Sequence, residues 1–396
     1  MRVAVVDDAG MGVMGGKGVF GKELYSYLLS VAYEILGHQV VRVILGSGTS
    51  EFNDAIRLQG TSIPVLRAFY DRGLTVSLNK LLMKMDIDLV HVNILNPRYV
   101  NTIISTVKSR AMLFLTMHSY SYVCPTGWKV KFPQTIPCNT TPPSSACIRC
   151  MYSMHRNFQI PITRLLKGLY QQCALKKLLD ESDIVISPSR LLARKVKEEI
   201  GGKHVLHIPN PLPRDFAIEV PMKPRENAAL FIGRLEYEKG AHLLPEVAKL
   251  MKPVRLYVVG GGRLAKYIKE NSPENLVFRG YVTLEEKREL LNKVSVVVVP
   301  SIYCDTYPTV VLEAFATGRP IVAFDLGGPK ELIEDTGGGL VVKPYDIEDF
   351  AIKARALAED LNKSYEMGLR GRNYITSENS IEIYATRLQK VIESII

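Results

Sequence analysis

The chain has 396 residues, of which 47% are hydrophobic and 23% charged, and its formal net charge is +10. This composition is that of an ordinary globular protein, and the length allows two domains of usual size. No run approaches the roughly 18 apolar residues of a bilayer-spanning helix, which argues against a transmembrane protein. The positive charge favours anionic partners such as nucleotide phosphates, nucleic acid or an acidic membrane face, although scattered lysines that aid solubility would explain it equally well.

The first residues, MRVAVVDD, have the pattern of a β-strand and lack the basic and apolar regions of a signal peptide. We therefore expect a cytoplasmic protein in which the six cysteines are mostly reduced. Peripheral contact with a membrane stays open.

Short apolar runs alternate with longer amphipathic segments through the first half of the chain. The runs predicted as strands are residues 3–8, 40–45, 87–93, 111–117, 183–187 and 203–209. The segments predicted as helices are Phe20–Leu36, Pro97–Lys108 and Arg190–Ile200. Strands that alternate with helices favour a parallel sheet covered on both faces.

The same alternation restarts after a segment with five prolines. Strands are predicted at residues 229–234, 254–262, 276–281, 294–301, 320–325 and 339–343. Helices are predicted at His242–Met251, Thr283–Asn292, Pro329–Asp335 and Ile381–Ile396. We therefore expect an α/β fold with two doubly wound domains that face a central cleft. The expected parts are an N-terminal domain (1–207), a linker (208–227), a C-terminal domain (228–378) and a terminal helix (379–396) that packs back on the N-terminal domain.

Ligands of open α/β sheets bind at the carboxyl ends of the strands. Arg234, Gly260–Gly262, Ser301 and Gly327–Gly328 all fall at such ends. These positions therefore outline the expected site.

A glycine-rich loop follows the first predicted strand. Gly10–Gly15 fits GxGxxG, but the second strand ends without the acidic residue that a dinucleotide site requires. A P-loop is also disfavoured, because Met11 and Gly18 stand where its first glycine and its Ser or Thr belong. The loop is then either a place where a ligand approaches the backbone closely or a flexible turn.

The segment from Pro300 to Gly318 carries two acidic residues, Asp305 and Glu313. Pro308 favours a helix start, which puts Asp305 in a loop and Glu313 in the second helical turn. The helix N-terminus suits a phosphate, and carboxylates on either side suit hydroxyl-rich groups. This is a nucleotide-sugar site in outline.

Arg234 and Lys239 stand in a glycine-flanked loop, GRLEYEKG, that follows a predicted strand. Arginine can bind phosphate oxygens in a fork and lysine can act as a point charge. A cluster of surface charges is the alternative.

The combined pattern resembles glycosyltransferase family 4, the retaining nucleotide-sugar transferases with the GT-B fold. The motifs are GGKG (Gly15–Gly18), His118, PSR (Pro188–Arg190), PNP (Pro209–Pro211), GRLEYEKG (Gly233–Gly240), VVGGG (Val258–Gly262), FRGYV (Phe278–Val282), Asp305 with Glu313, TGRP (Thr317–Pro320) and GGPKEL (Gly327–Leu332). They follow the family's order and span nearly the whole chain.

The resemblance implies that Arg234 and Lys239 bind the donor diphosphate and neutralise the leaving group. It places Glu313 at the ribose, Asp305 at the transferred sugar and His118 near the sugar and the acceptor. The other positions implied to bind the donor are Gly15, Gly16, Gly233, Gly260, Gly262, Tyr281, Val282, Tyr307, Pro308, Thr309 and Val310. Of these, the backbone at Tyr281 and Val282 would receive the base.

The resemblance also implies a UDP-, GDP- or ADP-hexose donor, an acceptor-binding N-terminal domain and no catalytic metal. Two departures from the family pattern stand out. Asp305 replaces the usual glutamate, which bears on sugar preference, and Ser119 replaces the acidic neighbour of His118.

Four cysteines, Cys124, Cys138, Cys147 and Cys150, fall within an insertion at residues 119–155. Four thiolates at these separations can hold a structural zinc ion, while an iron–sulfur cluster, disulfides or unrelated thiols are the alternatives. His155 is a candidate substitute ligand. Cys173 and Cys304 stand apart, and we expect them to be buried thiols.

Basic and apolar residues alternate downstream of the insertion. The basic ones are Arg164, Lys167, Lys176 and Lys177, and the apolar ones are Ile162, Leu165, Leu166, Leu169 and Leu178. This pattern fits a helix on an anionic membrane, or one that packs its apolar side on the core.

The leading hypothesis is a glycosyltransferase that acts on a glycan, a glycolipid or a similar acceptor. An epimerase or hydrolase of nucleotide sugars with the same fold is the second. A zinc-stabilised nucleic-acid-binding protein is the third, disfavoured because the cations do not gather with aromatic residues on one face.

Overall fold

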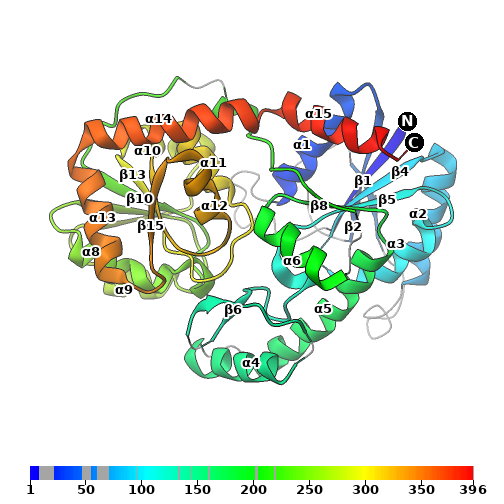
Figure 1. The fold of residues 1–396 in the computed structure, drawn as a ribbon, viewed down its shortest axis with the longest axis horizontal. Coiled ribbons are helices and arrows are strands. Elements are labelled where there is room, and N and C mark those ends of the chain that lie inside the picture. Colours follow the sequence, from blue (N-terminus) through cyan, green and yellow to red (C-terminus); the bar gives the residue numbers. More distant parts are fainter. Residues whose placement is uncertain are drawn as a thin grey trace.

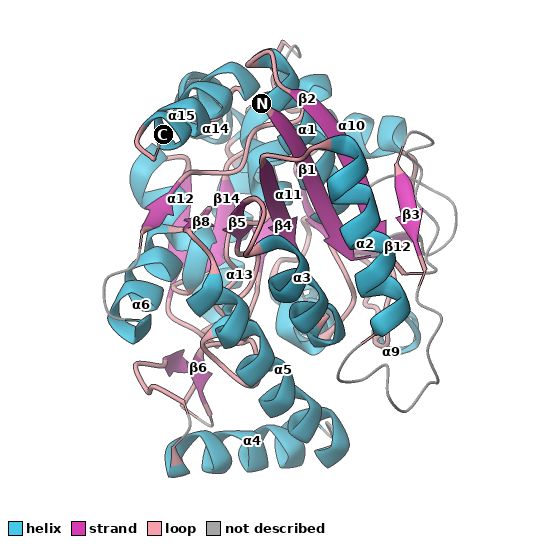
Figure 2. Ribbon diagram, turned by 90° about the vertical axis from the view of Figure 1, so that its right-hand side faces the viewer, coloured by secondary structure: helices cyan, strands magenta, loops and turns pink. Residues whose placement is uncertain are grey.

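The computed structural model describes residues 1–8, 22–46, 55–59, 71–94, 96–132, 134–142, 144–158, 161–200, 204–217 and 220–395. Its chain forms two parallel sheets, each with helices on both faces (Figures 1 and 2). The predicted doubly wound α/β architecture is thus confirmed.

The first sheet has the strand order β3-β2-β1-β4-β5-β8-β9, and all its strands are parallel. The strands are β1 (Arg2–Asp8), β2 (Gln39–Leu45), β3 (Ile56–Leu58), β4 (Leu89–Asn93), β5 (Met112–Thr116), β8 (Ile184–Ser187) and β9 (Val205–His207). Every residue of β4 is buried, as expected for a central parallel strand covered on both faces.

Between β1 and β9, and apart from the insertion, the described residues form five helices of eight or more residues. They are α1 (Lys22–Ile35), α2 (Arg72–Met85), α3 (Val100–Val107), α5 (Ile162–Glu181) and α6 (Arg190–Ile200), with a short 3₁₀ helix, η2 (Pro97–Tyr99), before α3. Helix α2 is absent from the helices predicted above. Its signals are an N-cap aspartate, Asp71, that accepts from the Leu74 N–H at 3.0 Å, and buried leucines every fourth residue from Leu74 to Leu82.

The second sheet has the strand order β12-β11-β10-β13-β14-β15 and is also parallel. The strands are β10 (Ala228–Ile232), β11 (Arg255–Val259), β12 (Leu276–Gly280), β13 (Val296–Val299), β14 (Ile321–Phe324) and β15 (Gly339–Val342). The strand order reverses between β10 and β13, the position at which doubly wound sheets bind their ligands.

The helices of this half match or extend the predictions. They are η4 (Tyr237–Lys239), η5 (Ala241–Leu243), α8 (Leu244–Leu250), α9 (Ala265–Asn271), α10 (Leu284–Lys293), α11 (Thr309–Ala316), α12 (Gly327–Thr336), α13 (Ile347–Glu359) and α14 (Leu361–Glu378). Helices α9, α13 and α14 are absent from the helices predicted from the sequence.

Two segments join the halves. The expected linker contains a short helix, α7 (Arg214–Ala217), and its Leu212 and Phe216 are buried in the core of the second sheet. The return segment leads from α14 into α15 (Ile381–Glu393), which runs back over the first sheet (Figure 1). There α15 packs on α1, and the hydroxyls of Tyr25 and Tyr384 are hydrogen-bonded at 2.5 Å.

The insertion forms a small projection beside the two sheets (Figures 1 and 2). It contains η3 (Tyr120–Tyr122), the two-residue strands β6 (Val130–Lys131) and β7 (Ile136–Pro137), and α4 (Ser145–Phe158). Among the helices in the described ranges, none combines the length and apolarity needed to span a bilayer.

Candidate functional site

The point where the second sheet reverses its strand order brings together residues that the sequence analysis selected. Arg234 and Lys239 follow β10, and Asp305 follows the neighbouring strand β13. All three therefore lie at the same carboxyl edge of the sheet.

Lys239 is held against Asp305 by an ion pair from its Nζ to Oδ2 of the aspartate. Its ammonium also lies 5.1 Å from the centre of the Tyr303 ring. Asp305 is 7% exposed, so the pair is shielded from water on the aspartate side. Lys239 thus presents a cation with a fixed position beside the loop that precedes α11.

Arg234 is the more accessible cation. Its guanidinium Nη2 lies 3.1 Å from Oε1 of the buried Glu238, while 63% of the side chain is exposed. The neighbouring Glu236 instead binds Arg263, whose Nε lies 2.6 Å from Oε2. An arginine has five N–H donors, so the ion pair with Glu238 occupies only part of the Arg234 donor set.

Glu313 lies in the second turn of α11, as predicted, but its carboxylate is buried. Its Oε1 accepts from Lys287 Nζ on α10 at 2.7 Å, and both side chains are 5% exposed. A capping box between Thr283 and Glu286 fixes the first turn of α10, which carries Lys287. The sequence analysis missed this lysine, although it stands three and four residues before the buried Leu290 and Leu291.

Helix α11 begins at Thr309, with Pro308 as its N-cap residue, one position before the place predicted for the proline. The first-turn N–H groups, including those of Thr309 and Val310, have no partner within the helix. Tyr307, just before the cap, is buried, and its hydroxyl accepts from Asn379 Nδ2 at 2.9 Å. Asn379 therefore connects the return segment to this loop.

The selected glycines let two loops pack backbone against backbone. Gly260 has φ +128°, and a Cβ there would overlap the carbonyl of Gly233. Gly262 has φ +152°, and a Cβ there would overlap the backbone of Leu235. Glycine is needed at these positions for the fold of the site, whether or not a ligand touches them.

Tyr281 and Val282 stand at the end of β12, beside the same glycine loop. Val282 is buried, whereas Tyr281 is 45% exposed and its ring lies against Gly261. This end of the sheet therefore presents backbone next to a partly exposed aromatic ring.

His118 follows β5 and connects the first sheet to the second. Its Nε2 is 3.2 Å from Asn93 Oδ1, its ring packs edge-on against Tyr25, and its carbonyl accepts from Thr306 Oγ1 at 2.7 Å. Ser119 caps η3 by accepting from Ser121 N–H. One polar partner of His118 that the sequence did not indicate is thus Asn93, at the end of β4.

The PSR and GGPKEL motifs meet across the two halves. Glu331 on α12 accepts hydrogen bonds from the Ser189 hydroxyl and, at 2.7 Å, from the Arg190 N–H. Arg190 also pairs with Asp335 at 2.6 Å. Burial raises the pKa of Glu331. These motifs therefore join the two halves at the N-terminus of α6, a role that the sequence alone did not reveal.

Gly15 and Gly16, expected beside the donor diphosphate, lie outside the described residues.

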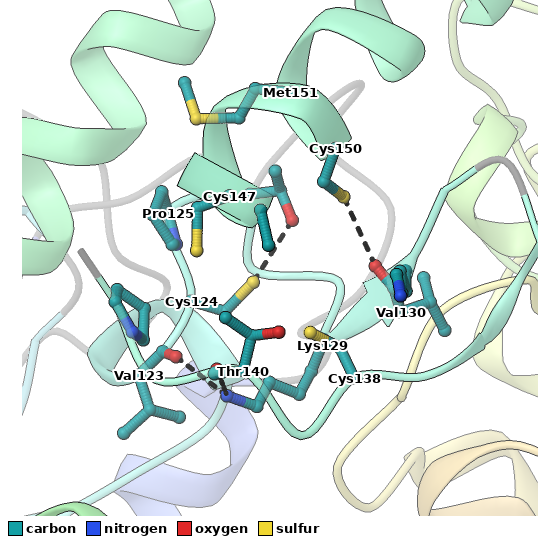
Figure 3. A pocket seen from close by; sticks show the side chains of 14 residues that line it. Val123, Cys124, Pro125, Lys129, Val130, Cys138, Thr140, Cys147, Cys150 and Met151 are labelled. Atoms are coloured by element: carbon teal, nitrogen blue, oxygen red, sulfur yellow. Dashed lines mark hydrogen bonds between the residues drawn. The ribbon is translucent and has the colours of Figure 1, made fainter. Parts of the chain in front are cut away.

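The four cysteines of the insertion line a single pocket (Figure 3). Burial, with a smaller contribution from the charges of the other three thiols, raises the pKa of Cys150 to about 11. As the side chains stand, no three His, Cys, Asp or Glu residues of the described chain form a metal-binding group. His155 lies further along α4, outside this lining.

All six cysteines are described, and each is a free thiol. Cys304 is buried, as expected, but the expectation for Cys173 was wrong, since it lies exposed on α5.

Comparison with known proteins places this geometry in context. Residues 226–360 match the family model Glycosyl transferases group 1. The chain is 28% identical over 180 residues to glycogen synthase from Mycobacterium tuberculosis (strain CDC 1551 / Oshkosh), which covers 43% of each chain. It is 33% identical over 165 residues to poly(ribitol-phosphate) alpha-N-acetylglucosaminyltransferase from Staphylococcus aureus (strain COL), 39% of this chain and 32% of that protein. The match thus spans less than half the length of these curated relatives.

The fold is similar over its whole length to that of Anabaena Alr3699/HepE, solved in complex with UDP. The TM-score is 0.71 and the identity 16%, with 100% of both chains covered. The same Anabaena protein has also been solved with UDP-glucose. At this identity the likeness concerns the fold, and it confirms the predicted GT-B arrangement.

Proposed function

We propose that this chain transfers a hexose from a UDP-sugar to a glycan or glycolipid. Residues 226–360 match the group 1 glycosyltransferase family, and the chain has the GT-B fold. We further propose that it retains the anomeric configuration. The observation that carries the proposal is the meeting of Arg234, Lys239 and Asp305 with the N-terminus of α11 at one sheet edge.

The diphosphate of the donor is assigned to the two cations and the helix start. In the absence of donor, Asp305 holds Lys239 in place. A diphosphate offers this lysine a competing anion, and the accessible guanidinium of Arg234 can bind a second phosphate oxygen. The N–H groups of Thr309 and Val310 add donors that do not need to reorganise.

Asp305 is assigned to the hydroxyls of the transferred sugar. Once Lys239 turns to the phosphate, the Asp305 carboxylate can accept from sugar hydroxyls. Its side chain is one methylene shorter than the glutamate usual in family 4, so it reaches a shorter distance toward the sugar. Donor preference among hexoses is therefore expected to depend on this residue.

Glu313 is assigned to the ribose, with Lys287 as the residue that positions it. Lys287 occupies one carboxylate oxygen, Oε1. The second oxygen is then the one that can accept from a ribose hydroxyl, because a carboxylate accepts through both oxygens.

The reaction breaks the bond between the anomeric carbon and the β-phosphate oxygen. Negative charge grows on that oxygen, and Arg234 and Lys239 stabilise it most strongly in the transition state. An acceptor hydroxyl oxygen forms the new bond to the anomeric carbon on the same face, and its proton passes to the departing phosphate. His118 lies on the side of the first sheet, where the acceptor is assigned.

An anionic membrane is the proposed location of the acceptor. Exposed apolar side chains gather on α4 and the first half of α5: Ile148, Tyr152, Ile162, Leu166 and Tyr170. Exposed cations stand among them: Arg149, Arg156, Arg164 and Lys167. An apolar face with basic residues is typical of helices that lie in a membrane interface.

The nucleotide-sugar epimerase or hydrolase stays the alternative within enzymes. A transferase releases UDP faster when an acceptor is present and forms a larger glycan, whereas a hydrolase releases UDP and free sugar without one. The comparisons favour neither this alternative nor nucleic-acid binding.

The experiment measures UDP release from UDP-sugars with a panel of glycan and lipid-linked acceptors. Arg234→Ala and Lys239→Ala should each lower turnover by about 10²- to 10³-fold, the cost of removing one preorganised donor to a developing anion. Lys249→Ala is the control, because Lys249 is exposed on α8 and its pair with Glu246 is exposed as well. If both variants fold and keep near wild-type turnover, the assignment of Arg234 and Lys239 to the donor diphosphate is wrong.

A further inference from the structure

Cys124, Cys138, Cys147 and Cys150 come from three separate stretches of the insertion. Cys124 follows η3, Cys138 follows β7, and the other two lie in the first two turns of α4. Although the sequence separates the first from the last by 26 positions, all four line one pocket (Figure 3). Four thiols around one space are the ligand set that zinc favours in structural sites.

The present partners of these sulfur atoms are weak. Cys124 Sγ lies 3.2 Å from Thr126 Oγ1, Cys147 Sγ is 3.4 Å from Ser144 Oγ, and Cys150 Sγ is 3.5 Å from the Val130 carbonyl. Sulfur is a poor donor and acceptor, so these contacts cost little to break. Rotation about the single χ1 bond moves each sulfur atom without moving the backbone. As they stand, the four sulfur atoms do not form a metal-binding group, so binding one ion requires them to turn toward the pocket that they share.

The surroundings suit a negatively charged centre. Among the described residues that line the pocket are two lysines, Lys129 and Lys131, and no carboxylate. Lys129 is buried, and its ammonium donates to the carbonyls of Val123 and Thr140 and pairs with Glu199. Four thiolates and one Zn²⁺ carry a net charge of −2. Lys131 adds a cation to this lining, whereas the charge of Lys129 is already paired with Glu199.

The insertion has little regular secondary structure to stabilise it, so a metal cross-link would stabilise its fold. Between Cys124 and the start of α4, its only strands in the described part are β6 and β7, of two residues each. Such a segment buries little apolar surface by itself, and a metal that binds only the folded form adds its binding free energy to folding.

The same segment braces the loop of the proposed donor site. The Cys304 N–H donates to the Trp128 carbonyl at 2.8 Å, and Cys304 Sγ contacts the Lys129 carbonyl at 3.5 Å. The rings of Trp128 and Tyr303 lie 6.4 Å apart. Trp128 and Lys129 stand between two of the cysteines, whereas Tyr303 and Cys304 directly precede Asp305.

We propose that Cys124, Cys138, Cys147 and Cys150 bind one Zn²⁺ ion, and that this site holds the Trp128–Lys129 brace against the loop carrying Asp305. The second part rests on the proposed function. Loss of the metal then loosens the loop that carries Asp305 and weakens nucleotide binding, although the metal itself lies outside the donor site.

The first measurement is the metal content of the full-length protein, purified under reducing conditions and supplied with Zn²⁺. We expect one zinc per chain, and a cobalt-substituted protein with the absorption of tetrahedral thiolate coordination. The Cys147→Ser/Cys150→Ser variant should lose both signals, while Cys173→Ser, which changes an exposed thiol on α5, should keep them. Zinc at background level in the reduced wild type, iron with sulfide in its place, or unchanged zinc in the double variant would overturn the site.

The second measurement is UDP affinity of the wild-type protein before and after zinc removal by a chelator, which needs no variant to fold. Zinc removal should weaken UDP binding at least tenfold, and zinc addition should restore it. Equal affinity with and without zinc would overturn the brace. If the zinc-loaded protein binds none of UDP, GDP or ADP, the proposed function fails, while the metal content still decides the zinc site.

Discussion

Asp305 and Glu313 each meet a lysine, but the two pairs differ in exposure. Lys239 is about one-fifth exposed beside Asp305, whereas Lys287 and Glu313 are both 5% exposed. A partly exposed pair can exchange its partner for a ligand at modest cost. A buried pair is costly to separate, because the remaining charge stays without compensation. The first pair is therefore suited to respond to the donor, and the second to hold Glu313 in place.

Lys287→Met is expected to lower the free energy of unfolding by about 3–5 kcal/mol, since it leaves Glu313 buried without its lysine. The double variant Lys287→Met/Glu313→Leu should lose much less. The measurement is urea unfolding at neutral pH. Lys249→Met is the control, because its exposed pair should contribute less than about 1 kcal/mol. A loss in Lys287→Met no larger than that of the control would contradict the buried-pair account.

The sequence indicates the acidic residues of the site but not their partners. Asp305 and Glu313 lie eight positions apart around a proline, a local pattern that predicts a loop and a helix turn. Lys287 belongs to α10, 26 positions earlier, and reaches Glu313 only through the packing of the two helices. Asn93 and His118 are likewise joined only because β4 and β5 are neighbours in the sheet.

Helix α5 shows at the element scale why the sequence pattern left two interpretations open. Its second half packs into the core through Leu175, Leu178 and Leu179, whereas Ile162 and Leu166 in the first half are more than half exposed. A single basic amphipathic pattern therefore includes both the buried second half of α5 and the exposed apolar face of its first half. The exposed half continues onto α4, which projects from both sheets (Figure 1).

Leu166→Asp should weaken binding to anionic phospholipid vesicles by about tenfold or more, because burying a leucine side chain contributes about 1.5–3 kcal/mol. Co-sedimentation with anionic and with neutral vesicles measures the effect. Ile352→Asp is the matched control, since Ile352 is also more than half exposed but lies on α13 of the other half. Vesicle binding that is absent in the wild type, or equal in both variants, would rule out the proposed membrane face.

At the scale of the whole molecule, the strand–helix alternation predicted both sheets. One element that it missed, strand β3, has a weak local signal. Strand β3 has three residues at a sheet edge and is largely exposed, so it lacks an apolar run. Leu212 and Phe216, in the expected linker, are buried by contacts with the second sheet that proline content cannot indicate.

The core of the first half contains a histidine that makes stability depend on pH. Burial, with a smaller contribution from the charge of His118, lowers the pKa of His91 from 6.5 to about 3. Its ring nitrogens are hydrogen-bonded to Tyr33 at 2.8 Å and Thr116 at 2.7 Å. Between pH 6.5 and 3 the unfolded chain binds a proton at this residue and the folded chain does not, so the folded state loses stability as the pH falls.

The expected loss from His91 at pH 4.5, relative to pH 7, is about 2–3 kcal/mol. Urea unfolding at the two pH values measures it. Between pH 7 and pH 4.5, the free energy of unfolding of His91→Gln should fall by about 2–3 kcal/mol less than that of the wild type. The free energy of unfolding of His204→Gln, a variant at an exposed histidine, should fall as much as that of the wild type. Equal pH dependence in His91→Gln and the wild type would show that His91 is not the responsible group.

The most direct test of the donor site is a calorimetric titration of the protein with UDP and with uridine. UDP should bind at least about 100-fold more tightly, because charged hydrogen bonds contribute about 1.5–3 kcal/mol each. Lys239→Ala should remove most of that advantage and leave the affinity for uridine unchanged. Equal affinity of the wild type for UDP and uridine, or an unchanged advantage in Lys239→Ala, would contradict a diphosphate site at Arg234, Lys239 and the start of α11.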